Sequence, residues 1–275
     1  MTAATAQVQQ VAPGVMRLTA PNPGPMTGPG TNSYIVGTGP CVIIDPGVDD
    51  AAHLDTLIAA APGPVVAIVI THAHPDHSGG ARALADTTGA PIRALPVRLA
   101  GVRDRSLVVD QPLHDGDVLT LGDVTLEAVH APGHTADHLC FYARESRLLL
   151  AGDTVMADVT VVILPPDGRM TDYFASLERL QGMAIDAIAP GHGRLLHDPA
   201  AELQQIVAHR RAREAEVRAV LDDGRAHSAE TIANGLYTDL DTRLLPVAAA
   251  QVEAHLIRLA EFDQAVQTDD GWRSS

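Results

Sequence analysis

The sequence has 275 residues, of which 46% are hydrophobic, and it carries a formal net charge of −15 at pH 7. This charge disfavours nucleic acid as a partner, because contacts between basic side chains and phosphates supply most of the non-specific affinity for nucleic acids. All 19 basic residues are arginine, which excludes lysine Schiff-base chemistry, and the 3% of aromatic residues leave little material for a base-stacking surface.

Short β-rich runs separated by Gly, Pro and Asp predominate in the first two thirds of the chain. Helical patterns interrupt them at 48–61, 79–88 and 170–183. Several runs are almost wholly apolar, which indicates sheets that are covered on both faces. We therefore predict an α/β layered domain, with strands at 15–19, 32–37, 41–45, 65–71, 117–122, 124–132, 138–143 and 147–153.

The pattern changes near residue 200. A long helical stretch ends near residue 221, shorter helical stretches follow at 228–237 and 244–262, and the tail at 263–275 has a strand and a turn. This order predicts a catalytic domain over 1–200, followed by a long helix and a winged-helix-like domain over 201–275. The tail is itself acidic, so we expect it to pack internally or to form a homodimer rather than to bind DNA.

The stretch THAHPDHSGG, residues 71–80, follows the apolar strand predicted at 65–71. His72 and His74 are two positions apart, so in an extended backbone both rings project to the same side. Asp76 and His77 follow on the turn into the next helix. A solvated turn is the alternative interpretation, but imidazole and carboxylate together suit zinc, iron or manganese.

Three further strand ends carry side chains that bind metals. His134 follows one apolar strand on a Pro-Gly turn, Asp153 ends another after glycine, and His192 ends a third within Pro-Gly-His-Gly. Glycine beside each of them lets the backbone approach closely. Because ligands gather at the carboxyl ends of strands in open sheets, these residues predict one metal-binding site.

The ordered motifs HAHPDH, GHT, GD and PGHG resemble those of the metallo-β-lactamase superfamily of metal-dependent hydrolases, over about residues 15–200. The resemblance implies an αββα sandwich. It also implies two divalent metal ions, zinc being the first expectation and iron or manganese the alternatives. Their ligands would be His72, His74 and His134 for the first ion, Asp76, His77 and His192 for the second, and Asp153 as a bridge to both.

Within the superfamily, the chain resembles most the winged-helix-bearing beta-lactamase-like protein 2 branch, which includes an endoribonuclease. The core is also similar to glyoxalase II thioesterases and to lactonases. Zinc β-lactamases that destroy antibiotics fit less well, since they are typically exported and many have cysteine where Asp153 stands.

The leading hypothesis for function is a hydrolase in which a metal-bridging hydroxide cleaves the ester, lactone or thioester bond of a small molecule. Asp76 is the catalytic candidate, because it could also accept the proton of the water. The alternative is a single-strand-specific endoribonuclease or phosphodiesterase of the same fold. An iron-containing redox or non-catalytic protein is the third hypothesis, which the absence of a flavin domain disfavours.

Other residues have supporting roles in this hypothesis. We expect Asp45, which ends a strand, to orient a histidine ligand, as partners of metal ligands generally do. His138 is expected to brace the site rather than to bind metal. Tyr173 is a candidate hydrogen-bond donor to the substrate, although packing is the more common role. The stretch 209–214, HRRARE, is typical of a solvated helix face, but it could bind an anionic substrate if it pointed inward.

The remaining expectations concern location and partners. The start of the chain has neither the basic nor the apolar segment of a signal peptide, and no apolar stretch reaches the length of a membrane span. Cys41 and Cys140 form no CxxC pair, which is typical of a reduced compartment. We expect a cytoplasmic enzyme with a small-molecule substrate and no membrane partner. The sequence leaves open the substrate, the metal, the oligomeric state and the role of the C-terminal domain.

Overall fold

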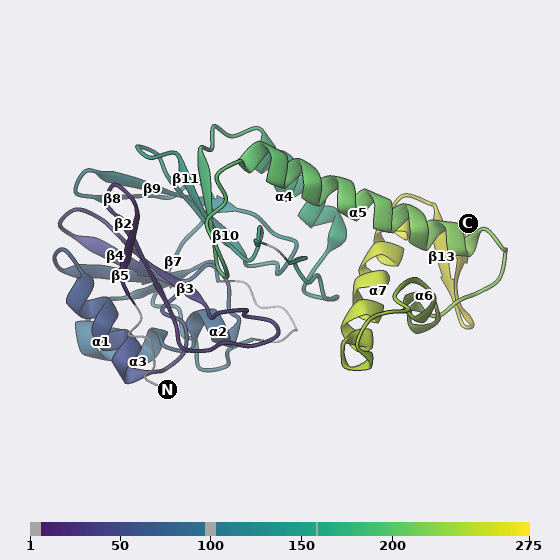
Figure 1. Ribbon diagram of the computed structural model, residues 1–275, viewed down its shortest axis with the longest axis horizontal. Helices are drawn as coiled ribbons and strands as arrows, with labels where there is room; N and C mark the ends of the chain where they lie inside the picture. Colours follow the sequence, from purple (N-terminus) through teal and green to yellow (C-terminus); the bar gives the residue numbers. More distant parts are fainter. Residues whose placement is uncertain (1–6, 97–102, 158) are drawn as a thin grey trace. The chain divides into compact units, whose positions relative to one another are not determined.

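The computed structural model describes residues 7–96, 103–157 and 159–275. The chain divides into two compact units, whose segments can be followed by colour in Figure 1. The first unit contains the residues up to 131 together with 137–159 and 183–199. The second unit contains 132–136, 160–182 and 200–275.

A seven-stranded mixed sheet forms one layer of the first unit, with its strands in chain order from β1 to β7. The pairs from β1 to β4 are antiparallel and those from β4 to β7 are parallel. The strands are β1 (Gln9–Ala12), β2 (Val15–Thr19), β3 (Asn32–Val36), β4 (Cys41–Ile44), β5 (Val65–Val69), β6 (Ile92–Ala94) and β7 (Gln111–Pro112). In the described connections of this sheet lie the helices α1 (Ala51–Ala60), α2 (Pro75–Ser78) and α3 (Ala81–Thr88).

A second sheet of the first unit has the strand order β12-β11-β10-β9-β8. Its pairs are antiparallel except for the parallel pair of β11 and β12. The strands are β8 (Val118–Leu121), β9 (Val124–His130), β10 (Leu139–Ala143), β11 (Leu148–Gly152) and β12 (Ala187–Pro190).

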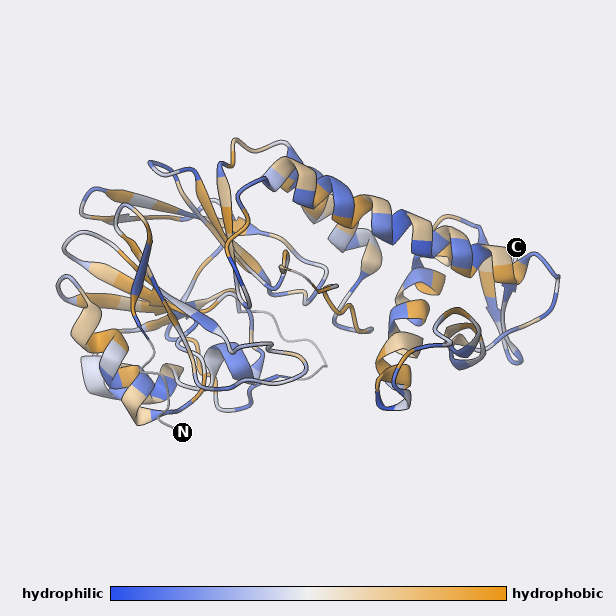
Figure 2. Cartoon of the chain, viewed as in Figure 1, coloured by the Kyte–Doolittle hydropathy of each residue, from blue (hydrophilic) through white to orange (hydrophobic). Residues whose placement is uncertain are grey.

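The two sheets pack face to face, and helices cover the outer face of the first. Val42 of β4 belongs to a core cluster that also contains Phe141 of β10 and Leu150 of β11. The next residue, Ile43, points the other way and packs in a cluster with Leu57 of α1 and Leu84 of α3. Successive side chains of a strand face opposite sides, so a strand buried on both faces is apolar throughout. Figure 2 shows this hydrophobic colouring along the strands. The predicted α/β layers are confirmed.

The second unit has a core of its own, in which Val217, Ile232, Val252 and Trp272 are buried together. No helix in the described part of the chain is both long and apolar enough to cross a membrane. The elements of this unit are α4 (Met170–Gln181), α5 (Pro199–Leu221), α6 (Ala229–Leu236), the 3₁₀ helix η1 (Thr242–Leu244), α7 (Leu245–Glu261) and the antiparallel hairpin of β13 (Ala265–Thr268) and β14 (Gly271–Ser274).

Candidate metal centre

Four of the predicted ligand residues lie just beyond the carboxyl end of β5. His74 is the N-cap residue of α2, and Pro75 follows in the first turn, where its missing N–H breaks no helical hydrogen bond. This short helix begins directly after the strand connection, so Asp76 and His77 lie close to the two preceding histidines. The rings of His72 and His77 have centroids 4.3 Å apart.

Glycines let two more strand ends approach this group. A Cβ atom added to Gly191 would lie 2.5 Å from Oδ1 of Asp153 and 2.8 Å from Cε1 of His77. A Cβ added to Gly152, whose φ is +48°, would lie 2.7 Å from Nε2 of His138. Both contacts are too short for a real side chain, so glycine is needed at these positions for Asp153 to reach its place.

Asp76, His77 and His192 form one donor group, in which all ligand atoms lie within 4.8 Å of one another. The Nε2 atoms of His77 and His192 are 3.3 Å apart. Oδ1 of Asp153 lies 3.4 Å from Nε2 of His77 and 3.5 Å from Nε2 of His192. Two ring nitrogens and two carboxylates therefore converge on one small volume. We call Asp76, His77 and His192 the carboxylate-bearing half of the cluster.

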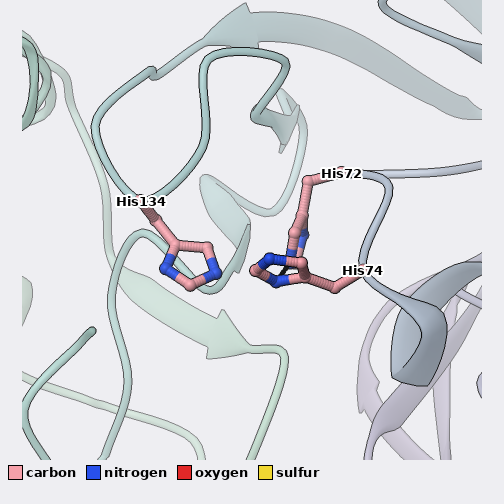
Figure 3. A group of neighbouring side chains, drawn as sticks. All are labelled: His72, His74 and His134. Carbon is pink, nitrogen blue, oxygen red and sulfur yellow. Dashed lines mark hydrogen bonds between the residues drawn. The ribbon is translucent and has the colours of Figure 1, made fainter. Parts of the chain in front are cut away.

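His72, His74 and His134 form a second donor group with the same limit of 4.8 Å, and their rings are drawn in Figure 3. Nε2 of His72 and Nδ1 of His74 are 2.9 Å apart. We call these three residues the imidazole-only half. A third group, His72, His77 and Asp153, connects the two halves. The structure therefore brings all seven predicted ligand residues into overlapping groups.

Hydrogen bonds on the outer side of the rings fix which nitrogen faces the cluster. Nδ1 of His77 lies 2.8 Å from Oδ2 of Asp45, and Nδ1 of His192 lies 3.2 Å from the carbonyl oxygen of Gly30. The hydroxyl of Thr71 donates to Asp45, so it accepts from Nδ1 of His72 at 3.0 Å. Each Nδ1 donates to an acceptor, which places the lone pair of that ring on Nε2.

Asp45 adopts an uncommon backbone conformation to serve two of these rings. Its φ is +49°, in the left-handed region that Asp tolerates better than most residues. The buried carboxylate accepts from the backbone N–H and the hydroxyl of Thr71 at 2.8 and 2.7 Å, in addition to contacting His77. The expected contact between Asp45 and a histidine of the motif is therefore present.

His138 touches the backbone beside the cluster. Its Nε2 accepts from the backbone N–H of Asp153 at 3.0 Å, and its Nδ1 lies 3.1 Å from the hydroxyl of Thr154. The ring also stacks on His72, with centroids 4.9 Å apart. Since the lone pair of Nε2 is engaged by a backbone N–H, the contacts favour bracing over metal binding, as the sequence suggested.

The carboxylates and the histidines of the cluster shift one another's pKa values. Burial alone would raise the pKa of Asp153, but His77 and His192 outweigh it and hold that pKa well below its ordinary value. Burial would lower the pKa of His192, yet hydrogen bonds to Asp153 and Asp76 raise it to about 9. Burial likewise opposes the charged form of His77, whereas Asp153 and Asp45 raise its pKa. The carboxylates thus stabilise positive charge in their midst, as a cation site requires, and the nitrogen and oxygen donors fit a borderline divalent metal.

Two residues that contact the ligand motif, Thr71 and Asp137, were not singled out from the sequence. Asp137 is buried, and its Oδ2 accepts from the backbone N–H of Ala73 at 3.2 Å and from Arg103 at 2.8 Å. It therefore anchors the residue between His72 and His74. Its position within GHTADH, beside a ligand motif, was the available signal.

The structure places Tyr173 in the packed interior of the second unit. The side chain is fully buried, and a Cβ on Gly133 would lie 2.4 Å from the Cα of Tyr173. The tyrosine offers no exposed surface to a substrate, so the structure favours the packing role over the substrate contact that the sequence allowed.

Comparisons with known proteins agree with this fold and site. The family model of the Metallo-beta-lactamase superfamily matches residues 26–192, and that of the Beta-lactamase associated winged helix domain matches residues 228–272. The chain therefore belongs to the metallo-beta-lactamase superfamily and is a metal-dependent hydrolase with a C-terminal winged-helix domain. The family, the fold and the winged helix predicted from the sequence are confirmed.

Individual relatives extend over most of the chain. A Beta-lactamase-like protein 2 homolog of Caenorhabditis elegans is 29% identical over 238 residues, which cover 84% of this chain and 79% of the relative. An Atrochrysone carboxyl ACP thioesterase of a Cryptosporiopsis species is 32% identical over 220 residues, which cover 78% of this chain and 65% of the relative. The crystal structure of a Beta-lactamase domain protein from Burkholderia ambifaria has a TM-score of 0.80 at 23% identity, and the match covers 100% of this chain and 95% of that one.

Proposed function

We propose that the chain is a dinuclear metal-dependent hydrolase that cleaves the ester, thioester or lactone bond of a small molecule. The observation that supports it is the overlap of three donor groups, in which the group of His72, His77 and Asp153 links the other two. In this proposal Asp153 would serve as a ligand to both divalent cations. Zinc is the first candidate, and the same donors suit iron and manganese.

The carboxylate-bearing half would hold one ion and the imidazole-only half the other. Divalent cations held in such a site activate water as a nucleophile and polarise the oxygen of the bond that is cleaved. The protein's own contribution is orientation: Asp45, Thr71 and the Gly30 carbonyl fix the ring nitrogens, so that the lone pairs need no rearrangement.

Asp76 is proposed as the catalytic carboxylate. Its side chain is 29% exposed, against 9% for that of Asp153, so it is the more accessible acid of the cluster. Its pKa is lowered, because hydrogen bonding to His192 and the charge of His77 outweigh burial, which acts in the opposite direction. It is therefore ionised at neutral pH and can take up the proton that the attacking water loses.

A small neutral or acyl substrate is favoured over RNA. The net charge of −15 and the lack of lysine oppose a polyanion, and one relative is named as an ACP thioesterase. Cleavage of single-stranded RNA is the second candidate, which the resemblance of the motifs to the branch with an endoribonuclease favours.

The test is a substrate panel of acyl thioesters, p-nitrophenyl esters, lactones, phosphodiesters and single-stranded RNA, with protein loaded separately with zinc, manganese and iron. We expect hydrolysis of a thioester, an ester or a lactone, and a loss of kcat/KM of about 10²-fold or more in Asp76→Asn. Asp55→Asn, an exposed change on α1, is the matched control and should behave as wild type. Cleavage of RNA alone, with binding that weakens steeply as salt rises, would replace the proposal by the second candidate.

A further inference from the structure

One hydrogen bond of His134 lies wholly within the second unit, to which this histidine belongs. Its Nδ1 lies 2.6 Å from the carbonyl oxygen of Val162. A carbonyl can only accept, so Nδ1 is the donor and the ring's lone pair is on Nε2. The direction in which the Val162 carbonyl points therefore sets the orientation of the imidazole.

The peptide group that carries this carbonyl is held by Gln251 of α7. The N–H of Ile163 belongs to the same planar peptide group as the Val162 carbonyl, and it donates to Oε1 of Gln251 at 3.0 Å. Nε2 of Gln251 donates to the carbonyl of Val161 at 3.1 Å. The glutamine, which is 9% exposed, thus binds the backbone on both sides of Val162. Its amide fixes the plane in which the carbonyl faces His134.

Arg210 of α5 holds the same segment from another helix. Its guanidinium donates through Nη2 to the Val161 carbonyl and lies 5.4 Å from the centre of the Tyr173 ring. The residue is only 2% exposed, burial lowers the pKa of its guanidinium, and no ion pair with a carboxylate is found for it in the described part of the chain. A buried charge without an opposite charge is costly unless its donors are hydrogen-bonded. The Val161 carbonyl accepts from one of these donors, so Arg210 and this backbone segment hold each other in place.

We propose that Gln251 and Arg210 are positioning residues for His134: through the peptide group between Val162 and Ile163, two helices that follow the catalytic domain in sequence set the orientation of a metal ligand. The inference rests on the proposed function, because it takes His134 to bind metal. In this proposal α5 and α7 contribute to metal binding. This role requires neither nucleic acid nor a second subunit.

The decisive variant is Gln251→Leu, which keeps the approximate size of the side chain and removes both hydrogen bonds. We expect the affinity for one of the two ions to fall by about 10- to 100-fold, the effect of losing a partner of a metal ligand. The visible spectrum of the cobalt-substituted protein should change, since one ligand ring is no longer fixed. Gln251→Glu keeps the acceptor for the N–H of Ile163 and should recover most of the affinity.

Glu214→Gln is the matched control. Glu214 of α5 contacts His255 at 3.3 Å and Arg258, both of α7, but it touches none of residues 161–163. Its loss should lower the free energy of unfolding and leave the metal affinity and the cobalt spectrum unchanged. If Gln251→Leu does not fold, the pair Arg210→Met and Arg210→Lys gives the same comparison, because only lysine retains a donor for the Val161 carbonyl.

The outcomes separate the two proposals. A wild-type protein that binds no zinc, manganese, iron or cobalt would overturn the proposed function. A wild-type protein that binds two ions, with Gln251→Leu matching it in affinity and spectrum, would overturn the positioning role alone. Equal losses of affinity in Gln251→Leu and Glu214→Gln would also overturn it, because the effect would then come from helix packing.

In metal-free protein, ¹⁵N chemical shifts of His134 should show the proton on Nδ1 in wild type and a mixture of tautomers in Gln251→Leu.

Discussion

The two halves of the donor cluster are held by different kinds of contact. In the carboxylate-bearing half, Nδ1 of His77 is hydrogen-bonded to the buried carboxylate of Asp45. Burial opposes the charged forms of His77 and His192, but the negative charge of Asp153 contributes to raising the pKa values of both. In the imidazole-only half, His72 and His134 each donate to a neutral oxygen, the Thr71 hydroxyl and the Val162 carbonyl. The first half attracts a cation by charge, whereas the second depends on the orientation of its rings. Single substitutions in each half should separate the effect of charge from that of ring orientation.

Asp153→Ala should have the largest effect, because this carboxylate is the oxygen donor grouped with both His72 and His77. We expect both ions to be lost and kcat/KM to fall by at least about 10²-fold. Loss of a residue that only hydrogen-bonds to a metal ligand costs up to about 10²-fold, so loss of a ligand itself should cost at least as much. Metal analysis of dialysed protein and steady-state kinetics are the measurements. Full metal content and activity in this variant would show that Asp153 is not a necessary ligand of either ion.

Gly191→Ala should act on the carboxylate-bearing half by crowding. The new methyl group would lie 2.8 Å from Cε1 of His77, a member of this half, and 2.5 Å from Oδ1 of Asp153, so these side chains or the turn must shift. We expect a loss of about 1–3 kcal/mol in the free energy of unfolding, as for other overpacked sites, together with weaker metal binding. Gly39→Ala is the control, because nothing lies within 4 Å of its added Cβ. Equal stability and affinity in both variants would show that the close approach of this turn to Asp153 is unimportant.

Asp45→Asn and Thr71→Val should distinguish the halves more finely. The first removes the charge that faces Nδ1 of His77, and the second removes the acceptor of His72. Each should weaken one ion by about 10- to 100-fold, with Asp45→Asn acting mainly on the carboxylate-bearing half. Competition with a chelator of known affinity measures the two binding steps. Identical binding curves for the two variants would mean that the halves are not distinct.

The smallest effect is expected in the pH dependence of the metal-free protein. The pKa of His192 is about 9 when folded, against 6.5 ordinarily, so its proton stabilises the folded state fully below about pH 6.5. That contribution is lost as the pH rises through about 9. Urea unfolding of chelator-treated protein should therefore give a lower free energy at pH 9.5 than at pH 6.5, and His192→Gln should reduce the difference. An unchanged difference in His192→Gln would assign it to other groups.

Much of this arrangement could be predicted because strand ends are visible in the sequence. The apolar runs before His72, His134, Asp153 and His192 mark buried strands, and the polar residues with glycine beside them mark the ends. The eight predicted strands have counterparts in the structure, whereas β1, β6 and β7 were not predicted. With three and two residues, β6 and β7 are too short to form a pattern.

The outer contacts could not be predicted in the same way. The carbonyls of Gly30 and Val162 are backbone groups that every residue has, so no residue type announces them. Arg210 lies in a charge-rich stretch that is typical of a solvated face, and only tertiary packing turns it inward. For Tyr173 the sequence left packing and a substrate contact open, with packing the more common role, and the full burial of the ring favours packing.

The most direct test of the account is anomalous diffraction from crystals grown with zinc and measured at the zinc absorption edge. We expect two peaks per chain, one at about 2.0–2.2 Å from ligand atoms of His72, His74 and His134 and the other at this distance from those of Asp76, His77 and His192, with Asp153 close to both. A single peak, peaks away from these seven side chains, or none at all would contradict it.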